Sequence, residues 1–484
     1  MQKIFSKPAE LEKLAKQKFS VPPFFMMEHA AQAMADFILQ KVGPTTATIL
    51  IICGKGNNGG DGYALGRLLN SSYKIILVGL EKPTAEEAFA QYNRCLDLGM
   101  EISNQLPEKI SADVIVDCIY GIGFHGDLRP TAKEILDKIN AATALKIACD
   151  VPSAFYFKAD YTITMGEHKT SLFADKANSM CGEILVADLG IEKDDFEGCL
   201  PCDAYLIEEK DIKLPLRKNK IANKGTYGHT TVFCGNKAGA AIIAGTAAMN
   251  FGSGLTTLLK TPQTDLQQFK ISPELMIADE IPVKTSAVVI GPGVVEHTPK
   301  DNEQFLQWFT SAKNPAAVLD AGILSFDGIA DLLKKLNAVD GARIVLTPHL
   351  LELARFLEKV RCAWPDCEIP EGALQVANLA NDAELKIAVG KILNRLYPRT
   401  TVIMKSANTF IAGGGDIFIC AGSCPSLAKG GSGDVLAGMA GALLAQGYSA
   451  TDAAITAVTR HSLAAKQFGP EAYNLTPLKL IDLL

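Results

Sequence analysis

The stretch "TILIICGKGNNGGDGYALGRLL", residues 48–69, turns from an apolar run into a loop rich in glycine. Its first residues are β-branched and apolar, as in a buried strand. Glycines and two asparagines then surround Asp61. A loop of this kind after a strand lets the backbone approach a ligand closely. The spelling matches neither the dinucleotide fingerprint G-x-G-x-x-G nor the phosphate loop G-x-x-x-x-G-K-[ST], so a phosphate cradle and a plain turn both stay open.

Strand and helix patterns alternate through the first half of the chain. The helical segment "PPFFMMEHAAQAMADFILQKV", residues 22–42, places Met27, Ala31, Met34 and Ile38 on one face. This alternation predicts an α/β fold with a Rossmann-like, doubly wound parallel sheet that has helices on both faces. The expected strands are "TILIIC" (48–53), "KIILVGL" (74–80), "DVIVDCIYG" (113–121), "LKIACDVP" (145–152) and "EILVADLG" (183–190).

A charged segment with a proline, "EEKDIKLPLRKNKIAN" at residues 208–223, separates this region from a second series of strands and helices. We expect two domains, 1–210 and 218–484, because the chain is longer than one core usually supports. In the second domain, "TFIAGGGDIFIC" at 409–420 predicts a hairpin over Gly413 to Gly415, and the end of the chain is helical.

Composition narrows the class of partner. The 484 residues include 47 basic and 53 acidic ones, giving a net charge of −6, and no run of Lys or Arg predicts nucleic-acid binding. No apolar stretch reaches the ~20 residues of a membrane helix. The twelve cysteines are scattered and often end apolar strands, as buried thiols do. We expect a cytoplasmic protein that acts on small molecules and contacts neither nucleic acid nor membrane.

The most specific stretch is "CPSLAKGGSGDVLAGMAGALLAQG", residues 424–447. Gly430, Gly431 and Gly433 come just before or at the start of a helix, where free N–H groups favour an anion. Asp434 lies where that anion would be held, so it could take a proton from a hydroxyl group while the amides hold a phosphoryl group. A plain helix cap is the alternative interpretation.

The sequence G-S-G-D at 431–434 resembles the G-x-G-D of ribokinase-fold kinases, whose glycines form an anion hole and whose aspartate is the base. With four further motifs in order, residues 218–470 resemble the ADP- or ATP-dependent NAD(P)H-hydrate dehydratase family. The motifs are "NKGTYGHTTVFCGNKAGAAIIAGTAAMNFGSGL" (223–255), "GPG" (291–293), "LTPHLLELARFL" (346–357), "MKSANTFIA" (404–412) and "LAKGGSGDVLAG" (427–438).

This resemblance implies a ribokinase-like domain that phosphorylates the C6 hydroxyl of hydrated NAD(P)H and then eliminates phosphate, with magnesium bound alongside ADP or ATP. Asp434 would act on the hydroxyl. Two departures from the family pattern concern substrate contacts: Gly322 stands where the pattern has a second acid, and Leu350-Leu351 follow His349 in place of Pro-Gly. By similarity, the hydrated nicotinamide site includes Ala240, Gly293, His349 and Asp434, and the nucleotide site includes Lys405, Ser406, Ala407, Asn408, Thr409, Gly430, Gly431 and Gly433.

Three acidic residues of the first half, Asp61, Asp117 and Asp150, belong to segments that follow or end apolar runs. The carboxyl ends of the strands of a doubly wound sheet share one edge, so we expect the three to converge on one cleft, although any single one could be a turn or cap residue. Their segments resemble the NAD(P)H-hydrate epimerase family over residues 1–205. The segments are "CGKGNNGGDGYALGRLL" (53–69), "DCIYGIGFHGDLRP" (117–130), "DVPSA" (150–154) and "ADYTITMGEHKTSLF" (159–173).

This second resemblance implies that Asp150 works on the epimerising centre and that Asn58, Asp117 and Ser153 bind potassium. Such a set of oxygen ligands suits a hard cation. Ala154 replaces a glycine of the family pattern, which matters if that position needs a positive φ. By similarity, the dinucleotide contacts Asn57, Asn58, Gly59, Gly60, Asp61, Gly121, Ile122, Gly123, Phe124, His125, Gly126, Asp127 and Asp150.

Together the two resemblances imply one bifunctional enzyme for NADHX and NADPHX. The first half would interconvert the R and S epimers, and the second would dehydrate the S epimer with ADP, the favoured nucleotide, or ATP, releasing AMP and phosphate in the case of ADP. Both families imply a homo-oligomer. Two alternatives stay open: a ribokinase-fold kinase for a small alcohol such as a vitamin precursor, and a first half that is a non-catalytic binding or dimerisation module.

Overall fold

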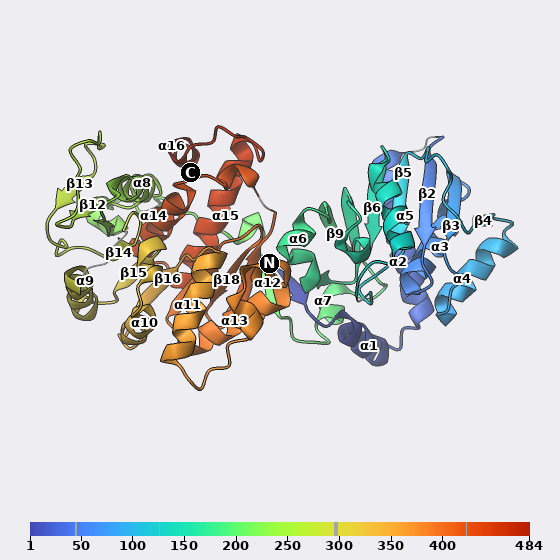
Figure 1. Ribbon diagram of the computed structural model, residues 1–484, viewed down its shortest axis with the longest axis horizontal. Coiled ribbons are helices and arrows are strands. Elements are labelled where there is room, and N and C mark those ends of the chain that lie inside the picture. The colour runs from blue at the N-terminus through green and yellow to red at the C-terminus, as the bar shows by residue number, and fades with distance from the viewer. Residues whose placement is uncertain (44–45, 125, 295–298, 423) are drawn as a thin grey trace. The chain divides into compact units, whose positions relative to one another are not determined.

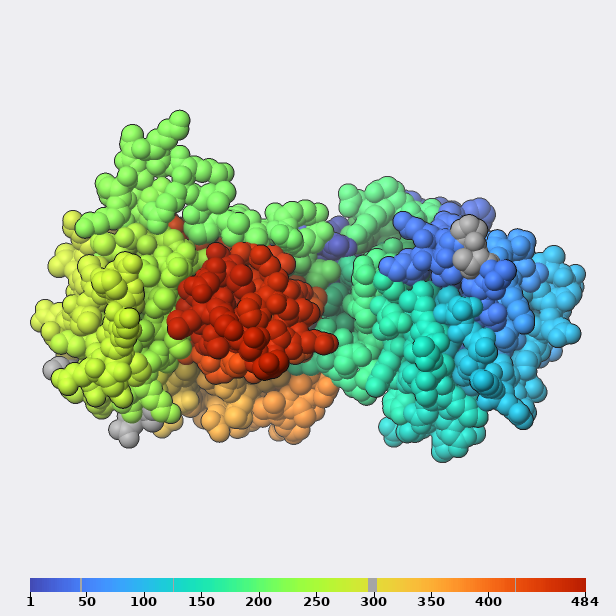
Figure 2. Space-filling model, turned by 90° about the horizontal axis from the view of Figure 1, so that it is seen from above, coloured from blue at the N-terminus to red at the C-terminus, as the bar shows by residue number. Residues whose placement is uncertain are grey.

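The computed structural model describes residues 1–43, 46–124, 126–294, 299–422 and 424–484 (Figure 1). The chain forms two compact units: Lys3–Asp203, and Ala204–Leu484 together with Met1–Gln2. Residues 208–223 lie within the second unit and are largely exposed on its surface (Figure 2).

The first unit is built on a parallel sheet with the strand order β4-β3-β2-β5-β6-β7-β9. The order reverses between β2 and β5, and such a switch point opens a crevice at the carboxyl ends of the two strands. The strands are β1 (Gln2–Phe5), β2 (Thr48–Cys53), β3 (Lys74–Gly79), β4 (Ile102–Ser103), β5 (Val114–Cys118), β6 (Leu145–Cys149), β7 (Tyr161–Met165), β8 (His168–Lys169) and β9 (Glu183–Ala187).

Helices cover both faces of this sheet, as predicted. Ile49 and Ile51 of β2 enter one core with α2 and α3, whereas Leu50 and Ile52 enter the other core with α5. Alternation along a strand thus fills two cores at once. The predicted apolar face of α2 is buried. The helices are α1 (Pro8–Phe19), α2 (Pro23–Val42), α3 (Asn57–Leu69), α4 (Glu86–Asp97), α5 (Pro130–Ala141), α6 (Asp175–Asn178) and α7 (Lys193–Glu197).

The glycine-rich stretch after β2 is mostly helix, because α3 already begins at Asn57. A Cβ atom on Gly59 would lie 2.0 Å from the carbonyl oxygen of Gly54, and one on Gly62 would lie 2.7 Å from Cys53 Sγ. On Gly60, a Cβ would meet the Met27 side chain at 2.6 Å. The close approach at these glycines is therefore between parts of the protein, which seats α3 directly against the sheet.

The second unit has the strand order β13-β12-β11-β14-β15-β16-β17-β18-β19-β10. Its strands pair in parallel except β18, which is antiparallel to both neighbours and forms the predicted hairpin with β19. The strands are β10 (Ala204–Leu206), β11 (His229–Cys234), β12 (Leu255–Lys260), β13 (Met276–Ala278), β14 (Ala287–Ile290), β15 (Ala316–Leu319), β16 (Arg343–Leu346), β17 (Thr400–Met404), β18 (Thr409–Gly413) and β19 (Asp416–Cys420).

The second sheet is also covered on both faces. Val232 of β11 packs in a core with α8, α14 and α15, while its neighbour Phe233 meets Phe305 of α9 edge to face at 6.5 Å. A Cβ on Gly438 of α14 would lie 2.1 Å from the carbonyl oxygen of Ala244 of α8, so these two helices touch backbone to backbone. The helices are α8 (Ala238–Asn250), α9 (Pro299–Ser311), α10 (Ile329–Asn337), α11 (Leu350–Ala363), α12 (Val376–Asn381), α13 (Ala383–Leu396), α14 (Ser432–Ala445), α15 (Ala450–Phe468) and α16 (Pro477–Ile481).

Within the described residues, no helix combines the length and apolar character that crossing a bilayer requires. All twelve cysteines are free thiols, and most of them are buried, as predicted.

Ala154 does adopt the left-handed backbone conformation that its family position favours for glycine, with φ +54°. We expect Ala154→Gly to raise the free energy of unfolding by about 1 kcal/mol, because an L-residue with a Cβ is strained there. Thermal unfolding of the first unit measures this. The matched change Ala90→Gly, inside α4, should lower it by a similar amount. Destabilisation by Ala154→Gly would contradict the prediction.

Candidate functional sites

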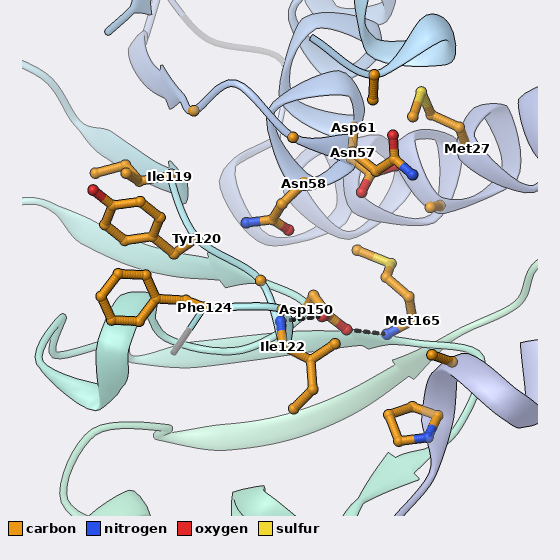
Figure 3. Close-up of a pocket in the computed structure, with 18 of the residues that line it drawn as sticks. Met27, Asn57, Asn58, Asp61, Ile119, Tyr120, Ile122, Phe124, Asp150 and Met165 are labelled. Carbon is orange, nitrogen blue, oxygen red and sulfur yellow. Dashed lines mark hydrogen bonds between the residues drawn. The ribbon is translucent and has the colours of Figure 1, made fainter. Parts of the chain in front are cut away.

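The first unit contains a cavity of about 680 Å³ at the switch point of its sheet (Figure 3). The polar side comes from the start of α3 and from the segments after β5 and β6. α2 adds an apolar wall with Met26 and Met27, and α1 adds Glu12 and Lys16 to the lining. A cavity with one apolar wall and a few convergent polar groups is the usual form of a small-molecule site.

Asp150 follows β6 directly and points into this cavity (Figure 3). Its backbone is left-handed, with φ +69°. One carboxylate oxygen accepts a hydrogen bond from the Ile122 amide at 3.3 Å and the other from the Met165 amide at 3.4 Å. The strained backbone, held by its surroundings, fixes the direction of the carboxylate.

A buried lysine that the sequence interpretation did not single out binds Asp150. Lys169 Nζ lies 2.8 Å from Asp150 Oδ1 and 3.2 Å from Glu167 Oε1. Lys169 and Glu167 are 3% and 2% exposed. Sequence offers only a weak signal for them, since "EHK" at 167–169 reads as an ordinary surface turn until β7 and β8 bury it.

Burial raises the pKa of two other carboxyl groups of the cavity, Asp61 and Glu167. Burial, with a further contribution from the charge of Asp150, raises the pKa of Asp61 well above its usual value. Burial also raises the pKa of Glu167 to about 7, although Lys169 opposes that rise. The cavity therefore combines a paired carboxylate with carboxyl groups that can hold a proton near neutral pH.

Of the residues proposed for potassium, Asn58 lines the cavity, whereas Asp117 and Ser153 are buried behind its wall. Ser153 donates its backbone N–H to Asp117 Oδ2 at 2.8 Å and its hydroxyl to Asp117 Oδ1 at 2.7 Å. Burial raises the pKa of Asp117 to about 6, against these hydrogen bonds. Within the part of the chain that the structure describes, the buried Oδ1 and Nδ2 atoms of Asn58 have no hydrogen-bond partner. An unpartnered amide oxygen, a carboxylate and a hydroxyl group are oxygen donors of the kind that a hard cation such as potassium takes.

The structure brings most of the predicted dinucleotide contacts together. Asp117 and Ser153 are fully buried behind the lining, Gly59 and Gly60 pack inward against the protein, and Gly126 stands apart from the lining. His125 lies outside the described residues. The predicted residues that line the cavity are Asn57, Asn58, Asp61, Gly121, Ile122, Gly123, Phe124, Asp127 and Asp150.

A second group of charged residues lies at the carboxyl ends of strands in the second unit. Lys405 follows β17, and its Nζ lies 3.1 Å from Oδ1 of Asp320, which follows β15. Thr347 donates its hydroxyl to the same Asp320 oxygen at 2.5 Å. Asp434, in the first turn of α14, remains without such a cation contact among the described residues. Burial, and next the charge of Asp320, raise the pKa of Asp434 to about 7, although Lys405 opposes that rise.

The start of α14 has the form of an anion site. Gly431, the residue before the helix, has φ +91°, and the first amides of a helix lack partners within it. A Cβ on Gly433 would lie 3.3 Å from Lys405 Nζ, so the lysine approaches these amides closely. His461 of α15, which sequence reasoning missed, contacts the Ser432 carbonyl oxygen with Nε2 at 3.0 Å. It thereby fixes the helix start.

Glycines also shape the other wall of this region. A Cβ on Gly293 would lie 2.1 Å from the Lys237 carbonyl oxygen and 3.2 Å from the Ala240 side chain, which places Ala240 beside Gly293. A Cβ on Gly322 would lie 1.8 Å from the carbonyl oxygen of Val294. No acidic residue fits at 322, so the departure from the family pattern has a steric reason.

The predicted adenine-nucleotide segment 405–409 joins β17 to β18 as a tight turn. Ser406 donates its hydroxyl to the Asn408 carbonyl oxygen at 2.6 Å, and Asn408 Oδ1 accepts the Gly422 amide at 3.1 Å. The buried Lys386 donates to Ser406 Oγ at 2.9 Å. Ala407 lies at the centre of this turn, Thr409 begins β18, and Gly430 stands in the loop before α14.

His349 is the N-cap of α11. Its Nδ1 accepts a hydrogen bond from the Glu352 amide at 3.2 Å, and the Glu352 carboxylate accepts one from the His349 amide at 2.9 Å. The spelling T-P-H-x-x-E that favoured a functional histidine is thus also a capping box. The imidazole is still about half exposed, and His349 pairs with Lys405 in an isolated parallel bridge, so it borders the same site.

A dinucleotide-type sheet followed by a sheet with a kinase-like anion site defines a two-part α/β enzyme. The model of the NAD(P)H-hydrate dehydratase family matches residues 230–484, and that of the YjeF-related protein N-terminus matches residues 24–171. The bifunctional NAD(P)H-hydrate repair enzyme Nnr of Helicobacter pylori is 34% identical and covers 100% of this chain and 99% of its own length. The enzyme of the same name from Coxiella burnetii is 30% identical, and the match covers 96% of this chain and 93% of that enzyme. The chain belongs to the family of bifunctional NAD(P)H-hydrate repair enzymes.

Among solved structures, the ADP/ATP-dependent NAD(P)H-hydrate dehydratase from Bacillus subtilis, co-crystallised with ATP/Mg²⁺, is similar to this chain. The match covers 55% of this chain and 91% of that one, with 24% identity and a TM-score of 0.44.

The capping geometry of His349 generates a stability prediction. We expect His349→Ala to lower the thermal stability of the second unit by about 1 kcal/mol, since one orphan amide of α11 loses its acceptor. His349→Asn, which keeps a side-chain acceptor, should stay within a few tenths of a kcal/mol of the parent chain. Equal stability of His349→Ala and the parent in thermal unfolding would contradict the capping role.

Proposed function

We propose that residues 1–210 interconvert the R and S epimers of NADHX and NADPHX, and that residues 218–484 dehydrate the S epimer with ADP or ATP. The observation that carries the second assignment is Asp434 beside the free amides of α14 and next to Lys405. A base, an anion hole and a cation at one helix start are the parts that phosphoryl transfer to a hydroxyl group needs.

In the dehydration, Asp434 takes the proton of the C6 hydroxyl while that oxygen attacks the terminal phosphoryl group of ADP, and AMP leaves. The amides of Gly433 and Asp434 hold the transferred group, and Lys405 offsets its charge. The lone pair of the ring nitrogen then expels phosphate, and loss of a C5 proton completes the double bond. Asp320 keeps Lys405 in place through the 3.1 Å ion pair.

In the epimerisation, Asp150 takes the proton of the C6 hydroxyl as C6=O forms and the bond from C6 to N1 breaks, its electron pair passing to N1. The carbonyl carbon is planar, so N1 can close on either face while Asp150 returns the proton. The amides of Ile122 and Met165 hold the carboxylate for both transfers. The apolar wall of α2 suits the nicotinamide ring.

Two ions complete the proposal. Asn58, Asp117 and Ser153 would hold potassium, which would stabilise negative charge at the ligand. Magnesium would enter with the nucleotide phosphates, as it commonly binds one or two carboxylates together with phosphate oxygens. ADP is the proposed nucleotide. A homo-oligomer is proposed from the family resemblance.

Each activity should depend on one aspartate. We expect Asp434→Asn to reduce dehydration of the S epimer by about 10²- to 10⁴-fold, the usual range for loss of a general base, while epimerisation persists. Asp150→Asn should reduce epimerisation by a similar factor, while dehydration of the S epimer persists. NADH formation at 340 nm with the separated epimers and ADP measures both, with Asp452→Asn at the exposed start of α15 as control.

These assays also separate the alternative functions. A stable phosphorylated product without NADH would indicate a kinase for a small alcohol, which the same anion site could serve. Unchanged consumption of the R epimer by Asp150→Asn would indicate a first unit that only binds.

The raised pKa of Asp434 gives a pH dependence. A base must be ionised to take a proton, so we expect kcat/KM for dehydration to rise about tenfold per pH unit below pH 7 and to level off above it, following the pKa of about 7. A steady-state profile at saturating ADP measures this. A flat profile below pH 7 would contradict the assignment of Asp434 as base.

A further inference from the structure

Lys169 is a buried cation of the first cavity, only 3% exposed. Besides Asp150 and Glu167, its ammonium group contacts Thr164 Oγ1 at 2.8 Å and the Met165 carbonyl oxygen at 2.9 Å. Burial alone would lower the pKa of Lys169, but Asp150 and Glu167 outweigh it and raise that pKa. The lysine therefore stays charged, and its N–H groups are directed at protein acceptors.

The cavity is lined by more Asp and Glu side chains than Lys and Arg side chains. Asp61 from α3, Asp150 after β6 and Glu167 after β7 all line it and are nearly buried. Glu12 of α1 adds a further negative charge that acts on Asp61 and Glu167, and the Cys149 thiol faces Asp61 at 3.9 Å. Lys16 pairs with Glu12 at 2.5 Å, and Lys169 contacts both Asp150 and Glu167. One buried ammonium group can compensate one buried carboxylate well, and a second only partly.

Lys169 lies closer to the Asp150 carboxylate than to that of Glu167. Asp150 Oδ1 lies at 2.8 Å and Glu167 Oε1 at 3.2 Å. The backbone amides that contact Asp150 are more distant, at 3.3 and 3.4 Å. Of these three contacts to the Asp150 carboxylate, the one with the ammonium group is therefore the shortest. Oδ1 thus meets the Lys169 ammonium group and the Met165 amide while Oδ2 meets the Ile122 amide, which limits rotation of the carboxylate.

We propose that Lys169 is a positioning residue for the epimerisation, an inference that rests on the proposed function of the first unit. Its ammonium group holds the Asp150 carboxylate turned toward the ligand through the 2.8 Å ion pair. Lys169 acts through Asp150 and makes no contact with the reacting atoms.

Kinetics of three variants tests this role. We expect Lys169→Met to lower kcat for epimerisation at pH 7 by at least about 100-fold, the size of a lost proton transfer, with KM within about threefold. Lys169→Arg, which keeps the charge, should recover at least about tenfold of the loss.

Two controls separate positioning from a merely structural role. Lys146→Met removes a half-buried lysine of β6 that donates to the Ala142 carbonyl oxygen away from the cavity, and it should leave epimerisation unchanged. Dehydration of the S epimer by the second unit of the same chain should persist in every variant. An equal loss of kcat in Lys169→Met and Lys169→Arg would overturn the proposal.

A measurement independent of activity decides the case if Lys169→Met folds poorly or if the parent chain does not epimerise. The carboxyl ¹³C resonances of aspartate-labelled protein report the surroundings of each carboxyl group, and Asp150→Asn assigns the signal. At about pH 7 we expect the Asp150 resonance to move in Lys169→Met, because that variant removes the cation 2.8 Å from Oδ1, and to stay close to its parent position in Lys169→Arg. An identical Asp150 resonance in all three proteins would overturn the role of Lys169. A parent chain that leaves the R epimer unconverted would overturn the proposed epimerase function alone.

Discussion

Both sites depend on parallel strand pairing, because it brings the carboxyl ends of neighbouring strands to one edge of a sheet. In the first unit this edge gathers Asp150 after β6 and the start of α3. In the second it gathers Asp320 after β15 and Lys405 after β17. Glycine makes the arrangement compact, since Gly59 and Gly438 let backbone meet backbone where any Cβ would collide. The chemistry of each unit is thus a consequence of how closely its helices sit on its sheet.

The two units solve the same electrostatic problem in the same way. Each buries a carboxylate against a lysine, Asp150 with Lys169 and Asp320 with Lys405. Each also keeps a nearby carboxyl group whose pKa burial raises, Asp61 in the first unit and Asp434 in the second. The proposed roles of the paired groups differ. In the first unit the paired Asp150 itself moves the proton, whereas in the second unit the paired Asp320 holds Lys405 and the unpaired Asp434 moves the proton.

Much of the fold could be predicted, because strand and helix differ in their apolar period. The strands β2, β5 and β6, the helix α2 and the hairpin of β18 and β19 all follow from local pattern. The pattern did not bring out β12, whose apolar run is interrupted by two threonines. Nor did it show that α3 starts at Asn57, since glycines and asparagines favour a loop when read alone. Tertiary packing overrode that local preference.

The sequence by itself determined the α/β class, the order of the motifs and the family, since these depend on residue types at fixed spacing along the chain. Only the tertiary structure decided that Lys169 and Glu167 belong to the first site, that His461 fixes the start of α14 and that His349 caps a helix. It also decided why Gly322 cannot be an acid. These facts depend on distances between residues far apart in the chain and on burial, because solvent exclusion sets both the charge of a carboxyl group and the space that a Cβ can occupy.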